Sequence, residues 1–161
     1  MFLNVDQVRA VAEHCAPDMQ ALIWAALLTG ARRGELFKLQ PGFIHKDHIT
    51  FTASTTKTSR TRDVPILPAL RPWLKYFPVN FKPDKASKLW DAAREKAGMP
   101  HVHFHDLRHS CASLMLSMGV DLYTIGEILG HVNVQTTRRY AHLQIKQKRT
   151  ALEKLSNLVL K

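Results

Sequence analysis

One helical pattern constrains the fold of this 161-residue chain more than any other feature. Apolar residues recur at helical spacing between 107 and 118, and Gly119 follows as a stop signal. The residues that form this stripe are Leu107, Cys111, Leu114, Met115 and Met118. The pattern places His105 and Arg108 near the start of the helix. A helix N-terminus offers backbone N–H groups and the positive end of the dipole, so this end is predicted to attract a phosphate.

Further elements are indicated along the chain. Asn4 and Gln7 form a capping box ahead of a first helix, and Pro17 opens a second one that ends at Gly30. Alternation over 48–53 and an extended stretch over 64–67 predict a hairpin with a polar tip, and 67–83 is a proline-rich connection. Four more helices are expected: one near 84–98, one capped by Asp121 and ending at Leu129, one capped by Asn133 that contains 136–140, and one near the C-terminus with Leu152, Leu155, Leu158 and Val159 on one face.

Charge and composition limit the classes of partner. The chain carries 23 Lys and Arg against 13 Asp and Glu, for a formal net charge of +10, and 45% of it is hydrophobic. This balance favours a polyanion, first of all nucleic acid, although ribosomal proteins and proteins of anionic membrane surfaces share it. Cys15 and Cys111 suggest neither a disulfide nor a thiolate metal site. The longest apolar run, 21–28, is too short to span a bilayer, and no signal-peptide pattern opens the chain, so we expect a soluble, cytoplasmic protein.

Five residues together predict phosphodiester chemistry. A phosphodiester resists attack because its anionic oxygens gain charge in the transition state, so catalysis needs fixed positive donors. Arg32 and Arg108 supply guanidinium forks, and His105 and His131 supply imidazoles that can bind phosphate or move a proton. Tyr140 can form a covalent phosphotyrosine, although its ordinary pKa of about 10 means that it needs help to ionise.

The spacing of these residues resembles the tyrosine recombinase (phage integrase) family, specifically its C-terminal catalytic domain. The motifs are Gly-x-Arg-x-Gly-Glu-Leu at 30–36, His-x-Leu-Arg-His at 105–109, Gly-His at 130–131, and Tyr140 nine positions later. The resemblance implies an α+β fold, mostly α-helical, with a small antiparallel sheet. It also implies site-specific DNA recombination through a 3′-phosphotyrosyl intermediate, without ATP, metal or another cofactor.

The resemblance assigns further residues to the site. The implied catalytic set is Arg32, Lys57, His105, Arg108, His131 and Tyr140. Lys57, on the hairpin tip, matches the lysine that protonates the departing 5′ oxygen, and its other interpretation is a DNA-backbone contact. Structural support is expected from Glu35, bonded to nearby backbone or to an arginine, and from His109. Contacts with DNA are expected from Arg60, Arg62, Arg138 and Arg139.

By the same resemblance, residues 1–161 are expected to be a single catalytic domain, with the usual N-terminal core-binding domain absent. This is what an excised domain or a truncated gene would give. The expected partner is double-stranded DNA, bound by a homo-tetramer on two duplexes that forms from free monomers, with accessory DNA-bending proteins allowed. We expect no membrane partner, and a place at the nucleoid of a bacterial or phage-infected host.

Other interpretations remain open at this point. The segment 112–140 also reads as a helix-turn-helix, which would make the chain a non-catalytic DNA-binding module, and a catalytically silent recombinase fragment is related to it. A type IB topoisomerase shares the phosphotyrosyl chemistry. The alternating His101, His103 and His105, with His109, can be read as metal ligands, a weaker interpretation because no cysteine or carboxylate set completes it. The last helix packs either on a neighbouring protomer or on its own core.

Overall fold

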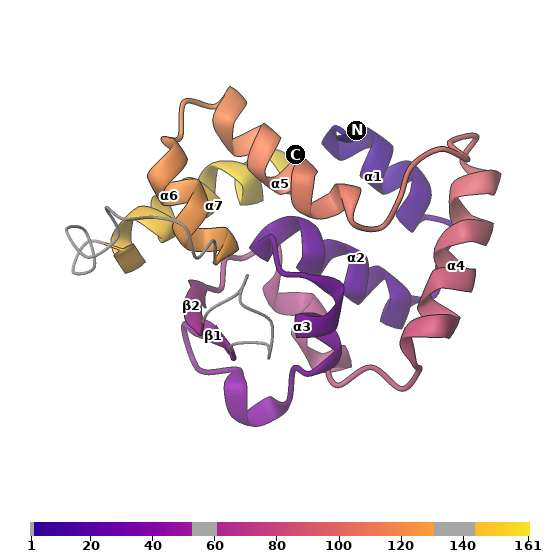
Figure 1. The fold of residues 1–161 in the computed structure, drawn as a ribbon, viewed down its shortest axis with the longest axis horizontal. Helices are drawn as coiled ribbons and strands as arrows, with labels where there is room; N and C mark the ends of the chain where they lie inside the picture. Colours follow the sequence, from indigo (N-terminus) through magenta and orange to yellow (C-terminus); the bar gives the residue numbers. More distant parts are fainter. Residues whose placement is uncertain (1, 53–60, 131–143) are drawn as a thin grey trace.

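A computed structural model describes residues 2–52, 61–130 and 144–161 of the chain (Figure 1). The described part is mostly helical, with one two-stranded sheet, as the sequence predicts. The α-helices are α1 (Val5–Ala12), α2 (Pro17–Thr29), α3 (Arg33–Phe37), α4 (Pro83–Lys96), α5 (Asp106–Ser117), α6 (Leu122–Leu129) and α7 (Gln144–Leu160). The 3-10 helices are η1 (Pro41–Phe43) and η2 (Arg71–Tyr76), and the strands are β1 (His48–Phe51) and β2 (Arg62–Pro65).

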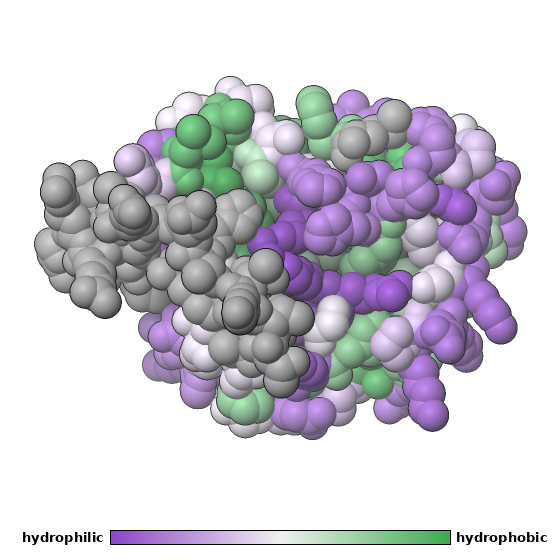
Figure 2. All heavy atoms as spheres, in the orientation of Figure 1, coloured by the Kyte–Doolittle hydropathy of each residue, from purple (hydrophilic) through white to green (hydrophobic). Residues whose placement is uncertain are grey.

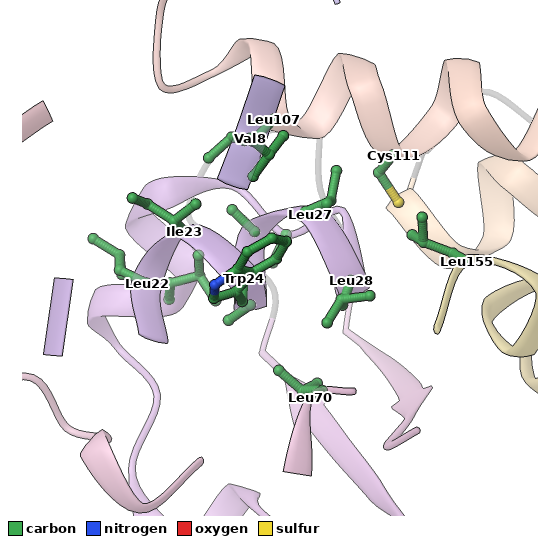
Figure 3. Packing of buried hydrophobic residues seen from close by; sticks show 14 of the residues in the cluster. Val8, Leu22, Ile23, Trp24, Leu27, Leu28, Leu70, Leu107, Cys111 and Leu155 are labelled. Carbon is green, nitrogen blue, oxygen red and sulfur yellow. The ribbon is translucent and has the colours of Figure 1, made fainter. Parts of the chain in front are cut away.

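Helix α2 forms the centre of the core. Every residue over 21–29 is buried, so the helix is enclosed on all sides and not only along the stripe that its spacing indicates. It contacts α1, α3, α5, α7 and η2. Figure 3 shows this packing, with Leu107 and Cys111 of α5, Leu70 and Leu155 arranged around the side chains of α2.

The helix ends follow local sequence signals. Asn4 and Gln7 make the predicted capping box: the Asn4 side chain accepts from the Gln7 N–H at 2.8 Å, and Gln7 accepts from the Asn4 N–H at 2.9 Å. Asp121 accepts from the Thr124 N–H at 2.8 Å and so caps α6. Gly30, at φ 71°, ends α2 where the sequence predicts a stop.

The first hairpin strand begins where it is predicted, and the second begins earlier. β1 pairs antiparallel with β2, with Ile49 opposite Val64 and Phe51 opposite Arg62. β2 therefore begins two residues earlier than the extended pattern indicates. A second difference is η2, a 3-10 helix with proline in its first turn, inside the stretch predicted only as a connection.

Helix α7 packs on the core of its own chain. Ala151, Leu152 and Leu155 are buried, and the helix contacts α2, α5, α6 and β2. Of the two arrangements open from the sequence, the structure shows this one. In the described part of the chain, no helix combines the length and the apolar character that crossing a bilayer would take.

Candidate functional site

Arg32 lies at the junction between α2, the core helix, and α3. Gly30 ends α2 in the left-handed conformation, and Arg32 is the N-cap residue of α3. Its backbone N–H donates to Oε1 of Glu35 at 2.8 Å, so the first turn of α3 fixes its main chain. The Arg32 side chain is half-buried. The backbone of this arginine is therefore anchored to the end of the fully buried core helix.

Arg108 brings a second guanidinium to this junction from α5. The residue is 6% exposed, and its Nη1 donates to the Gly30 carbonyl at 2.5 Å. Its Nη2 is buried and has no hydrogen-bond partner among the described residues. Burial, followed by the positive charges of Arg32 and Arg62, lowers the pKa of Arg108 to about 10. The side chain thus remains charged at neutral pH, with one donor group unused by the described residues.

The start of α5 differs from the anion site that the sequence predicts. The N–H groups of Asp106, Leu107 and Arg108 donate to the carbonyls of His103, Phe104 and His105, at 3.0, 3.0 and 3.1 Å. The Asp106 carboxylate accepts from the His103 N–H at 2.7 Å. Because a 3-10 turn satisfies these amides, side chains rather than backbone N–H groups supply the donors for an anion here.

His105 and His109 lie next to each other on the exposed side of this turn. Their rings pack edge to face, with 4.8 Å between centroids. Partial burial and the nearby positive charges of His109, Arg108 and Arg32 lower the pKa of His105. His105 is therefore a largely neutral imidazole at pH 7, able to donate from one ring nitrogen and accept at the other.

Glu35 of α3 and Arg62 of β2 form a buried ion pair next to the α2–α3 junction. Nη1 and Nη2 of Arg62 donate to Oε2 and Oε1 of Glu35, at 2.5 and 3.1 Å. Burial opposes the ionisation of Glu35, but the hydrogen bonds and charge of Arg62 hold the pKa of Glu35 below its usual value. Glu35 thus bonds both a backbone N–H, that of Arg32, and an arginine, the two kinds of partner expected for it.

Arg62 is not where the sequence places it. A surface contact with DNA is expected for this residue, whereas its side chain is 2% exposed and its Nε donates to the Ile128 carbonyl at 2.7 Å. A guanidinium enclosed in this way cannot reach a DNA backbone, so we place it with the support of the site. The signal that could find it is strand alternation, which puts Arg62 on the same inward face as Val64.

A cavity of about 540 Å³ opens beside Arg108. It lies between the α2–α3 junction, α4 and the 103–105 segment, and Trp90 and Phe104 form part of its wall. Figure 2 shows hydrophilic side chains in a band across the middle of this face of the molecule. The polar lining consists of Arg33, Ser87, Asp91, Arg94, His103, His105 and Arg108. Arg94 and Ser87 could not be assigned to the site from the sequence, because nothing in their local sequence pattern predicts that they lie beside the same cavity as His105.

Several predicted residues lie outside the described part of the chain. They are Lys57, Arg60, His131, Arg138, Arg139 and Tyr140, and the helix predicted to contain 136–140 lies there as well. Among the residues that are described, no group of three or more His, Cys, Asp or Glu is placed to hold a metal. Burial raises the pKa of the Cys111 thiol to about 12, so this cysteine stays protonated and is no candidate nucleophile.

Comparison with known proteins shows the family to which the chain belongs. The sequence model of the phage integrase family matches residues 77–147, which include α5 and the His105–His109 motif. The chain belongs to the phage integrase family. This confirms the family predicted from the sequence.

Relatives within the phage integrase family match different shares of the chain. The shufflon-specific DNA recombinase of Escherichia coli is 31% identical over 130 residues, covering 76% of this chain and 34% of that protein. The tyrosine recombinase XerC of Staphylococcus saprophyticus is 41% identical over 80 residues, covering 46% of this chain and 27% of that protein. The chain thus matches about a third of the length of these relatives.

A solved phage integrase domain has the same fold. The catalytic domain of bacteriophage HP1 integrase superposes with a TM-score of 0.66 at 27% identity. The match covers 94% of this chain and 93% of that domain. The described elements therefore correspond to an integrase catalytic domain along nearly their whole extent.

Proposed function

We propose that this chain is the catalytic part of a site-specific DNA recombinase that cuts and rejoins DNA through a 3′-phosphotyrosyl intermediate. The observation that carries the proposal is the guanidinium of Arg108. It is buried, charged at neutral pH, and has an Nη2 group without a hydrogen-bond partner among the described residues. Such a donor is costly unless a ligand accepts from it, and a phosphate oxygen is the acceptor that suits a guanidinium fork.

Arg32 and Arg108 act together on the scissile phosphate in this proposal. Arg32 contributes to lowering the pKa of Arg108, so the two charges lie within electrostatic reach of each other. A buried guanidinium and a half-buried one together stabilise the charge that develops on the non-bridging oxygens. His105, at the edge of the same site, donates a further hydrogen bond to the phosphate.

The covalent step is assigned to residues outside the described ranges. The phenol oxygen of Tyr140 attacks phosphorus, the bond to the 5′ oxygen breaks, and the DNA 3′ phosphate becomes esterified to tyrosine. The phenol proton passes to a general base, for which we propose His131, and Lys57 donates a proton to the departing 5′ oxygen. A 5′ hydroxyl from a partner strand then reverses the step, so no external energy source is consumed.

The partners follow from this chemistry. The substrate is double-stranded DNA, and exchange of strands between two duplexes requires four active sites, one for each strand. We therefore propose a chain that is monomeric in solution and assembles as a homo-tetramer on two duplexes. The names of its relatives, which include a shufflon-specific DNA recombinase, support this substrate.

A covalent trap with DNA of random sequence tests the proposal. The chain is incubated with nicked duplexes whose flanks are randomised, so that cleavage near the nick releases a short fragment and prevents religation. We expect protein–DNA adducts that survive denaturation with the unaltered chain and none with Tyr140→Phe. Sequencing of the trapped DNA then yields the target site.

Two outcomes would contradict the proposal. Adducts formed equally by Tyr140→Phe would remove the tyrosine from the mechanism, and binding without any adduct would indicate a DNA-binding module. Once a site is known, two labelled duplexes of different length distinguish a recombinase, which gives exchanged products, from a topoisomerase, which only reseals its own substrate.

A further inference from the structure

Arg62 has a position that the assigned chemistry does not use. It is 5% exposed, and each of its three guanidinium nitrogens donates a hydrogen bond. Its Cζ also lies 5.0 Å from the centre of the Phe51 ring. A side chain held by so many contacts has one conformation, and anything bonded to it inherits that fixed position.

The first connection of Arg62 leads to Arg32. Oε1 of Glu35 accepts from Nη2 of Arg62 at 3.1 Å and from the backbone N–H of Arg32 at 2.8 Å. One carboxylate oxygen thus joins the strand arginine to the main chain of the arginine that we place on the phosphate. A displacement of Arg62 would be passed to Arg32 through a single atom.

The second connection leads to the end of α6. Nε of Arg62 donates to the Ile128 carbonyl at 2.7 Å, and Gly130 lies directly against the same side chain. A Cβ atom at Gly130 would come 2.8 Å from Cδ and 2.9 Å from Nη1 of Arg62. Gly130, at φ 77°, is also the residue from which the chain continues to His131.

We propose that Arg62 is a positioning residue, which sets the relative placement of Arg32 and of the turn that leads to His131. The inference rests on the function proposed above, because it concerns the geometry of that reaction. The contacts span 27 and 66 residues of sequence, from β2 to α3 and from β2 to α6. The hairpin strand thus links two parts of the site that are distant in sequence.

A positioning function of the Glu35–Arg62 pair can be distinguished from a purely stabilising one by replacing both residues. A buried ion pair often adds little to stability compared with apolar residues of similar volume, whereas removing one partner alone leaves a costly unpaired charge. If the pair only stabilises the fold, an apolar replacement of both residues should preserve the site. If the pair positions Arg32 and the Gly130 turn, the same replacement should leave a folded protein with a misplaced site.

The test uses two variants of the full chain and the DNA site found by the covalent trap. Arg62→Lys keeps a positive charge beside Glu35 but cannot bond both Glu35 and the Ile128 carbonyl as the guanidinium does. The pair Glu35→Leu with Arg62→Met removes both charges, so we expect it to fold even where a single replacement does not. Single-turnover cleavage gives a rate constant, which reports geometry, and an amplitude, which reports the folded fraction.

We expect the rate constant to fall about tenfold in Arg62→Lys and about 100-fold in the apolar pair, since small misplacements of catalytic groups have effects of this size. The amplitude and the affinity for the uncleaved duplex should change less than about threefold, because the folded fraction and the phosphate contacts persist. The matched control is Arg149→Met with Glu153→Leu, which replaces an exposed ion pair of α7 by the same residue types and should cleave at the unaltered rate.

Rate constants within about twofold of the unaltered chain in both variants would overturn the inference, because the pair would then affect only stability. The same holds if only the amplitude falls. If the unaltered chain traps no duplex at all, the proposed function is overturned and the inference with it. The reaction of the unaltered chain, run beside the variants, therefore distinguishes the two failures.

Discussion

Arg108 is held charged at a position where charge is costly. A pKa of about 10 in place of 12.5 corresponds to about 3 kcal/mol in favour of the neutral form, while its bond to the Gly30 carbonyl recovers about 1–2 kcal/mol. The cost is present at every pH below about 10, because the guanidinium is then protonated. The buried charge of Arg108 thus lowers the stability of the fold, and it provides a hydrogen-bond donor for an anion.

The first prediction follows from this exchange. Arg108→Met should raise the free energy of unfolding by about 1 kcal/mol, because an apolar side chain fills the site without a buried charge. It should also abolish stabilisation by inorganic phosphate. Urea unfolding with and without phosphate at constant ionic strength measures both effects. Arg149→Met, at an exposed position, is the control and should stay within about 0.5 kcal/mol. A loss of stability on replacing Arg108 would contradict the prediction.

His105 gives a second prediction, on pH dependence. Partial burial and neighbouring positive charges lower its pKa in the folded state, so below about pH 6.5 the unfolded chain binds the proton more readily. The contribution of His105 to stability is therefore present above that pH and is lost as the pH falls. His105→Asn should flatten the decline of the melting temperature between about pH 6.5 and pH 5. An unchanged or steeper decline in the variant would exclude this electrostatic environment.

Of two turns that end helices, the turn at Gly130 contacts a residue that supports the site and the turn at Gly119, within the described part of the chain, does not. Gly130 and Gly119 have similar backbone angles, φ 77° and 84°, but a Cβ at Gly119 meets no heavy atom within 4 Å among the described residues. A Cβ at Gly130 would meet the anchored side chain of Arg62. The two glycines thus separate the cost of the left-handed conformation from the cost of steric overlap.

The third prediction compares these two turns. Gly119→Ala should cost about 1–2 kcal/mol of stability, the usual penalty for alanine in the left-handed region. Gly130→Ala should cost about 1–3 kcal/mol more, because Arg62 must move or the turn must open. Chemical denaturation of both variants gives the difference. Equal losses of stability in the two variants would mean that the Arg62 side chain moves aside at little cost. Such a result would count against Arg62 as a positioning residue.

Elements whose signals are local can be predicted from the sequence, whereas those fixed by distant contacts cannot. Asn4 and Asp121 cap their helices through partners three residues away, so a short stretch contains all the necessary information. The motifs likewise identify Arg32 and Arg108, which the fold brings to one junction. The position of Arg62 differs from its prediction because its partners lie 27 and 66 residues away in the sequence. In addition, a charged residue in a short strand is ordinarily predicted to be exposed to solvent.

The net positive charge of the chain bears on its function. The chain has a formal net charge of +10, and Glu35, a carboxylate next to the candidate site, is already engaged by Arg62. Arg32 and Arg108 therefore add to a positive potential that Glu35 does not cancel. A protein of this charge is expected to bind duplex DNA mainly by displacing counterions from phosphates.

The last prediction concerns the salt dependence of that binding. If about four to six phosphates are neutralised, the affinity for a short duplex should fall about 10²- to 10³-fold between about 50 and 200 mM salt. Fluorescence anisotropy with a labelled random-sequence duplex measures the slope of log K against log salt. Arg108→Met should reduce that slope by about one, because one phosphate contact is lost. Polyglutamate, a polyanion without phosphates, is the control ligand, and the Arg108 variant should bind it as the unaltered chain does. A slope that Arg108→Met leaves unchanged would mean that this arginine does not meet the DNA backbone, and would remove the observation on which the proposed function depends.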